Sequence, residues 1–310
     1  MMHFFKTPNI DFISKRKPAY VVSALLILIG IAATIIRGGY NYSIDFKGGT
    51  SVAVGFKDEV KTEQIRRVLG DAGFGGCEIK KFGGGNEYLI YVEQQKDVSA
   101  QDVAERIQQA FHSDPAIAGY ELRQIDTVGP KIGKELRSKA VWAILVSLAL
   151  ILTYVAIRYE FIFAVAAVAA VFHDVLVVLG FFPILNWEIS LKEIAAFLTI
   201  VGYSLNDTIV IFDRLRENAK LHRNENLAAV MNRSLNETLS RTIITALTVF
   251  TVCLILFLFG GEVIRGFSFA MLLGTIVGCY STVFVASPIA YEYYIRKGIG
   301  TELKMAKRKK

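Results

Sequence analysis

The side chain with the clearest chemical potential in this 310-residue chain is a carboxylate inside a hydrophobic segment, Asp207 in AAFLTIVGYSLNDTIVIFDR. A carboxylate near the centre of a membrane helix costs about 2.5–3.5 kcal/mol on insertion scales, so it normally faces protein or water and has a function. Asn206, Ser204 and Gly202 accompany it and predict a small, polar face for close helix approach. Asp207 is therefore a candidate proton carrier, with a structural, hydrogen-bonding Asp as the alternative.

A cation is placed where it could reach this carboxylate. Arg241 opens a later hydrophobic segment and is followed by Thr242, Thr245 and Thr248. Asp207 near the end of its segment and Arg241 at the start of the next one lie toward the same side of the membrane, so a long guanidinium could form a proton-dependent ion pair with the carboxylate. The alternative is an Arg that anchors its helix at the membrane interface.

A second pair of titratable residues, His173 and Asp174, lies about midway along another hydrophobic segment. Histidine titrates near neutral pH, and ionisable groups are rare in lipid, so a proton relay is one interpretation. The other is a neutral His that hydrogen-bonds to its neighbour within the helix.

Motifs for other chemistry are lacking in the sequence. It has no phosphate-binding loop, no metal-ligand cluster among four scattered His residues, and no nucleophile motif. We therefore predict no enzymatic activity, no catalytic residues, no cofactor and no metal site. A carboxylate in a membrane helix instead points to the proton gradient as the energy source.

The elements that must position these residues are six hydrophobic segments. The chain is 53% hydrophobic, with a mean hydropathy of +0.41. Each segment is near the roughly 20 residues that cross a bilayer as a helix. The predicted spans are residues 19–36, 140–157, 161–185, 194–212, 242–260 and 267–291.

Charge sets the expected orientation. The net charge is +7, yet residues 37–139 carry fifteen Lys or Arg and fifteen Asp or Glu. The surplus lies in short flanking segments, which is typical of membrane topology signals and not of a nucleic-acid surface. It marks the N-terminus (1–18), the loop 213–241 and the basic tail (292–310) as cytoplasmic, and the loop is expected to form an amphipathic helix along that face. Residues 37–139 must then lie outside.

The exported region shows alternating strand and helix patterns. TSVAVGF, CEIKKF, EYLIYVEQ and YELRQIDTVG are typical of strands, and two amphipathic helical segments separate them in the order βαββαβ. This order predicts a ferredoxin-like α+β sandwich inserted between the first two spans.

Five motifs in chain order resemble the bacterial SecF family of protein-export membrane proteins, part of the RND superfamily. They are SIDFKGGT, VGPKIGKEL, FHDV, GYSLNDTIVIFDRLREN and SLNETLSRTI. The resemblance covers essentially the whole chain. It implies half of an RND-type transporter in the bacterial inner membrane, and an accessory subunit that uses the proton motive force in late steps of preprotein export.

The resemblance also carries residue roles and partners. It places the family's essential intramembrane Asp on Asp207 and its characteristic Arg on Arg241. It implies SecD as a partner, together with the SecYEG channel, other accessory translocon subunits and unfolded preproteins, all in membrane lipid. The secondary polar candidates of the membrane segments are His173, Asp174, Asn206, Ser204 and Thr245.

Two other functions stay open from the sequence. One is small-molecule efflux, against which the single small exported domain argues because efflux pumps carry much larger ones. The other is a structural or assembly factor of the translocon that does not conduct protons. Whether Asp207 titrates would distinguish this factor from a proton-coupled subunit.

Overall fold

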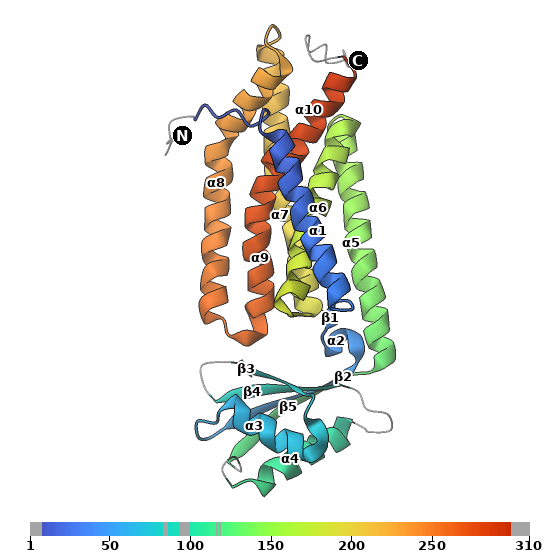
Figure 1. Cartoon of the computed structure of the whole chain (residues 1–310), viewed down its shortest axis with the longest axis vertical. Coiled ribbons are helices and arrows are strands. Elements are labelled where there is room, and N and C mark those ends of the chain that lie inside the picture. The colour runs from blue at the N-terminus through green and yellow to red at the C-terminus, as the bar shows by residue number, and fades with distance from the viewer. Residues whose placement is uncertain (1–7, 83–85, 94–99, 116, 118, 299–310) are drawn as a thin grey trace.

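The computed structural model describes residues 8–82, 86–93, 100–115, 117 and 119–298, and it contains a long helix bundle and a smaller sheet domain (Figure 1). Six helical stretches in the described part are long and apolar enough to cross a membrane. They are α1 (Arg16–Ile36), α5 (Pro130–Arg158), α6 (Phe161–Leu185), α7 (Leu191–Leu221), α8 (Leu227–Phe259) and the continuous stretch from α9 (Glu262–Ser281) to α10 (Ser287–Arg296). All six predicted spans therefore coincide with helices.

Helices α6 and α9 form the buried centre of the bundle, whereas α1, α5 and α8 expose most of their surface. Two glycines set the packing of α1 on α6: a Cβ built on Gly30 would lie 2.7 Å from the Cα of Gly180. Any side chain at either position would push the helices apart, so glycine is required at this crossing. The central position of α6 is what buries His173 and Asp174.

Two of the helices continue well beyond their predicted spans. Helix α7 runs on to Leu221 and α8 starts at Leu227, so most of the predicted loop 213–241 forms a helical hairpin continuous with the bundle. The expectation of a separate amphipathic helix lying along the membrane face is wrong. The apolar stripe of the segment, which includes Val230 and Met231, is instead buried in a core shared by the helices. This hairpin lies at the end of the bundle where both described chain ends emerge (Figure 1).

The segment before α1 packs on that hairpin through two Asn side chains spaced one turn apart. Asn236 accepts from the backbone nitrogen of Ile10 (3.0 Å) and donates to its carbonyl oxygen (2.8 Å). Asn232 accepts from the backbone nitrogens of Phe12 (3.0 Å) and Ile13 (3.1 Å). Because Phe12 and Ile13 are also buried, this segment fixes the start of α8. Residues 1–7 and 299–310, which include most of the predicted basic tail, lie outside the described residues.

The sheet domain is inserted between α1 and α5. Its elements are β2 (Gly49–Phe56), α3 (Thr62–Leu69) with a short π-helical turn (Gly70–Phe74), β3 (Glu78–Phe82), β4 (Glu87–Glu93), α4 (Ala100–Ser113) and β5 (Tyr120–Val128). This is the βαββαβ order that the sequence predicted. The strands pair antiparallel in the order β3-β4-β2-β5.

Alternation along the strands explains how this domain holds together. The side chains of Val52, Val54, Ile90 and Val92 point to one face and form a core with α3 and α4. The opposite face of the sheet is directed toward the helix bundle (Figure 1). Small residues, including Ser51 and Ala53, lie on that opposite face and are also buried, so β2 is covered on both sides.

The sheet domain is attached to the bundle by more than the chain itself. A short strand β1 (Asn41–Tyr42) pairs in parallel with β6 (Glu188–Ile189), which lies between α6 and α7. Helix α2 (Ile44–Lys47) follows, and its Asp45 accepts from the backbone nitrogen of Leu191 at the start of α7 (3.0 Å). These contacts anchor the entry to the sheet domain beside α7.

Candidate functional site

Asp174 of α6 is the centre of a buried polar network. It is fully buried, and it accepts from the hydroxyls of Ser204 on α7 (2.6 Å) and Ser281 on α9 (2.8 Å). His173 Nδ1 lies 3.0 Å from the other carboxylate oxygen. Buried carboxylates are tolerated when hydrogen bonds replace the lost water. Asp174 is thus a fully partnered carboxylate that ties three helices together.

The ring of His173 connects this network to Tyr280 and, through it, to α1. Its ring stacks against Tyr280, whose hydroxyl donates to the carbonyl of Ala19 on α1 (2.6 Å) and lies 3.2 Å from the Ser23 hydroxyl. The other ring nitrogen, Nε2, is buried and has no hydrogen-bond partner among the described residues. His173 therefore has one nitrogen beside the Asp174 carboxylate and one that no described residue contacts by a hydrogen bond.

Asp207 lies on α7, one turn beyond Ser204, and differs from Asp174 in its partners. It is buried, with 2% of its surface exposed, and its Oδ2 has no hydrogen-bond partner in the described part of the chain. Thr245 of α8 and Cys279 of α9 lie near it. A buried carboxylate oxygen without a partner is unfavourable while charged, and protonation relieves the cost.

Arg241 does not pair with Asp207 in this conformation. The guanidinium is exposed on α8 and acts on Asp207 electrostatically, but the described residues include no ion pair between the two. The predicted contact is therefore absent. Arg241 lies one turn before Thr245, whose hydroxyl donates back to the Arg241 carbonyl (3.0 Å).

The backbone of the last membrane stretch is irregular beside these residues. Residues Thr282–Ala286 form a π-helical segment directly after Ser281. Within it, the hydroxyl of Thr282 lies 3.1 Å from that of Thr208 on α7, and Thr208 also bonds the Ser204 carbonyl (3.1 Å). π-Helical turns are uncommon and occur often at functional sites. At the start of this segment Ser281 bonds Asp174 of α6, while the next residue, Thr282, contacts Thr208 of α7.

The structure joins several predicted residues and separates others. Asp207, Asp174, His173 and Ser204 lie within one polar region that spans α6, α7 and α9, and Thr245 borders it. Asn206 is exposed on the opposite side of α7, so its assignment to the same interior face is wrong. Gly202 is exposed as well, and a Cβ on it would meet open space, so it makes no close helix approach within this chain.

Sequence reasoning missed the contribution of the last membrane stretch. Ser281, Thr282 and Thr208 complete the polar region, yet none was singled out. A signal was present at the end of α9, where Gly278 packs against Ser204 of α7 and the hydroxyl residues Ser281 and Thr282 follow shortly after it. Within the described ranges, no three or more His, Cys, Asp or Glu side chains are grouped to hold a metal ion.

Comparison with known proteins agrees with this arrangement. Residues 109–296 match the family model described as protein export membrane protein SecD/SecF, C-terminal. The chain is 39% identical to the protein translocase subunit SecF of Endomicrobium trichonymphae, over 95% of this chain and 94% of that protein. It is 41% identical to the SecF subunit of Rhodothermus marinus, over 99% of this chain and 100% of that protein.

Longer relatives contain the same region as one part. The SecDF subunit of Thermus thermophilus is 40% identical over 94% of this chain, which spans 39% of that protein. The crystal structure of the translocon-associated SecDF from the same organism superimposes with a TM-score of 0.81 and 39% identity, over 95% of this chain and 40% of the SecDF chain. From the match of residues 109–296 to the family model and these near full-length relatives, the chain belongs to the SecD/SecF family of protein export membrane proteins.

Proposed function

We propose that this chain is an accessory subunit of a preprotein translocase, and that it couples proton movement through Asp207 to the export of polypeptides. The observation that carries the proposal is the contrast between the two buried carboxylates. Asp174 has three hydrogen-bonding partners, whereas Asp207 has an oxygen with none among the described residues. A carboxylate in that state gains most from binding a proton.

Arg241 gives this site a second state. When Asp207 is neutral, the exposed guanidinium has no need to approach it. When Asp207 loses its proton, the uncompensated charge attracts Arg241, and a movement of α8 or of the side chain brings the two together. Binding and release of a proton would thereby change the packing of α7 and α8. A proton that crosses roughly 100 mV supplies about 2.3 kcal/mol, enough to bias such a two-state element.

In this proposal the termini and the α7–α8 hairpin are cytoplasmic, and the sheet domain, a ferredoxin-like sandwich, lies on the outer side of the bacterial inner membrane. The distribution of Lys and Arg supports the orientation, and the opposite locations of the chain ends and the sheet domain are consistent with it (Figure 1). The chain would act as a coupling subunit, without enzymatic chemistry, cofactor or metal.

The proposed partner is a SecD-like chain of six further helices. Relatives in which the two regions form one SecDF polypeptide support this association. The described structure also leaves a suitable surface on α7, where Ala195, Thr199, Gly202 and Asn206 are exposed at spacings that share one side of the helix. Small residues and an amide in a membrane helix are typical of helix contacts. The SecYEG channel and unfolded preproteins complete the proposed set of partners.

Replacement of Asp207 by Asn tests the proposal, because Asn keeps the shape and cannot titrate. Translocation of a preprotein into inverted membrane vesicles is measured with and without an ionophore. We expect Asp207→Asn to reduce translocation to the level seen with the ionophore, while the subunit still assembles. Asp213→Asn is the matched control, since Asp213 is exposed further along α7 and should leave the stimulation intact.

The competing outcome is equally definite. If Asp207→Asn vesicles retain the full stimulation by the gradient, the carboxylate carries no protons, and the structural or assembly role gains support. An efflux function would be favoured instead if the variant lost resistance to small toxic molecules while preprotein export stayed normal.

A further inference from the structure

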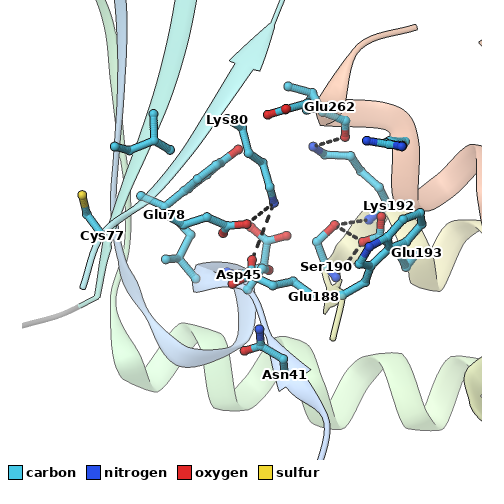
Figure 2. A pocket seen from close by; sticks show the side chains of 18 of the residues that line it. Asn41, Asp45, Cys77, Glu78, Lys80, Glu188, Ser190, Lys192, Glu193 and Glu262 are labelled. Atoms are coloured by element: carbon cyan, nitrogen blue, oxygen red, sulfur yellow. Dashed lines mark hydrogen bonds and ion pairs between the residues drawn. The ribbon is translucent and has the colours of Figure 1, made fainter. Parts of the chain in front are cut away.

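A polar cavity of about 550 Å³ lies where the sheet domain meets the start of α7 and α9 (Figure 2). Glu78 of β3 and Glu188 of β6 approach each other there, one from the sheet domain and the other from the bundle. Lys80 of β3 lies between them, with its Nζ 2.9 Å from Glu78 and 3.6 Å from Glu188. Two carboxylates thus share one ammonium group across the junction.

Strand β3 is also held by its backbone. The amide nitrogen of Lys81 donates to a carboxylate oxygen of Glu262 at the first residue of α9 (2.9 Å). β3 is an edge strand of the sheet, so this hydrogen bond uses a donor that no neighbouring strand takes. The junction therefore contains a contact from a backbone amide to a carboxylate and, beside it, a pair of carboxyl groups that share one ammonium group.

Other charged groups surround the carboxylate pair. The cations are Lys47 of α2, Arg66 of α3, Lys192 of α7 and Arg265 of α9, and the acids and the phenol are Asp45, Glu193, Glu262 and Tyr91. Several of these have their own partners: Lys47 pairs with Glu93 (2.7 Å), and Lys192 donates to the Val263 carbonyl (3.0 Å). The net charge of the side chains around the cavity therefore depends on whether one carboxyl of the pair is protonated.

Burial, together with the hydrogen bond and negative charge of Glu78, raises the pKa of Glu188 to about 8. Although burial opposes it, the neighbouring Glu78 and Glu188 hold the pKa of Lys80 above its ordinary value. Lys80 thus stays charged at neutral pH, and the proton that is gained or lost belongs to the carboxyl pair.

We propose that Glu78 and Glu188 form a proton-binding site, and that its occupancy holds β3 and the sheet domain against the helix bundle. With a proton bound, one carboxyl donates to the other and Lys80 neutralises the remaining charge. Without it, two carboxylates repel each other across the junction and β3 separates from α9. The β1–β6 pairing, to which Glu188 itself belongs, is made through the backbone, so it keeps the domain attached at its entry when the carboxylates repel each other. This site is distinct from Asp207 and does not require Asp207 to carry protons.

The direction of the pH effect follows from linkage. In the separated state Glu188 faces water and its pKa returns toward 4.5, whereas in the docked state it is about 8. A raised pKa in the docked state means that docking binds protons, so docking is strongest below about pH 4.5 and weakens as pH rises through about 8. Between pH 6 and pH 9 the docking equilibrium should fall by roughly ten- to a hundredfold.

A distance measurement on the full chain tests the proposal. Spin labels are attached to cysteines that replace exposed Glu121 on β5 and exposed Phe259 at the end of α8, in a chain whose three native cysteines are changed to alanine. Distance distributions are recorded by double electron–electron resonance at pH 6 and pH 9, in lipid nanodiscs. We expect one short, narrow distance at pH 6 and a longer, broader population at pH 9.

Matched variants identify the group responsible. Glu188→Gln imitates the protonated carboxyl and should keep the narrow distance at both pH values. Glu87→Gln makes the same change elsewhere in the sheet domain, beside Arg123, and should retain the pH response. A distribution that is the same at both pH values in the unmodified junction overturns the proposal. So does a pH response that survives in Glu188→Gln, because the titrating group would then lie elsewhere.

Discussion

Single residues in the membrane site differ in how their charge is compensated. Asp174 is compensated by direct hydrogen bonds from α6, α7 and α9, whereas Asp207 meets only the field of Arg241 and the nearby Thr245. Direct hydrogen bonds fix a geometry, and a field at longer range leaves the geometry free to change. Asp174 therefore holds the helices together, while Asp207 is the residue around which they can rearrange.

The role of Arg241 predicts a difference between two substitutions. If its positive charge is what matters, Arg241→Lys should keep most of the gradient-dependent export, and Arg241→Met should remove most of it. The two-pronged geometry of a guanidinium matters only where an ion pair forms face to face. Export into inverted vesicles with and without an ionophore gives the readout. Equal loss in both variants would instead indicate that Arg241 must form a bidentate contact with Asp207 during the cycle.

How far the sequence could reveal this site depended on the residue. Asp207, His173 and Asp174 were identifiable because an ionisable group in a hydrophobic segment is conspicuous by itself. Ser281 and Thr282 were not, because hydroxyl residues in membrane helices commonly bond their own backbone, and only the packing of the last membrane stretch on α6 and α7 brings them to Asp174 and Thr208. Asn206 was assigned to the wrong face because a sequence gives the angular spacing of residues around a helix but not which side of that helix is buried.

At the scale of elements, close helix packing depends on a few positions without side chains. Gly30 and Gly180 allow α1 to cross α6 at backbone contact, and this crossing brings Ser23 and Ala19 to Tyr280 beside His173. The position of α1 thus affects the polar site through the contacts of Tyr280.

Gly180→Leu should separate α1 from α6. A Cβ on Gly180 would lie 2.8 Å from the Cα of Gly30, and overpacking of this kind typically costs about 1–3 kcal/mol. We expect a lower unfolding temperature for the purified chain in detergent, measured by intrinsic fluorescence. Gly202→Leu is the control, since Gly202 faces open space and should leave that temperature almost unchanged. Equal effects of the two substitutions would contradict the packing argument.

The existence and order of the six spans and of the βαββαβ elements could be read from the sequence, but their ends and the short elements β1, α2 and β6 could not. Hydrophobic runs located all six spans. Alternating strand patterns and amphipathic helical segments gave the βαββαβ order. The helical hairpin that continues α7 and α8 was not predicted, because its polar residues look like a loop until Asn218 of α7 is seen to donate to Ser234 and Glu237 of α8. Hydrogen bonds of this kind hold the two helices together in place of the apolar contacts that a hydrophobic run would indicate.

At the scale of the whole molecule, the described helices leave a surface beside the site that this chain does not cover. Helix α8 is exposed along most of its length, and the small and amide-bearing side of α7 lies uncovered next to it. In an isolated chain this surface would face lipid, where an Asn side chain finds no partner.

The uncovered side of α7 predicts how the binding of a partner chain can be weakened without a change to the fold of this chain. Gly202→Leu fills the space that a helix of the SecD-like chain would occupy, so we expect severalfold less of that chain to copurify in mild detergent. Ala149→Leu on exposed α5 is the control and should leave copurification normal. Normal copurification of both variants would mean that the partner packs on another face.

The two points where the chain enters and leaves the sheet domain are neighbours. The entry follows α1 and is fixed by β1 and α2, the exit leads from β5 into α5, and Gly133 at the start of α5 lies close against Phe46 of α2. Once β3 separates from α9, the described contacts hold the sheet domain only at this corner, so a rotation there moves the corner little and the far side of the domain most. A slight tilt of α5 or α7 would then displace the distant helices α3 and α4 much further than the attachment point itself. A small movement within the membrane would thereby become a larger movement of the sheet domain outside it.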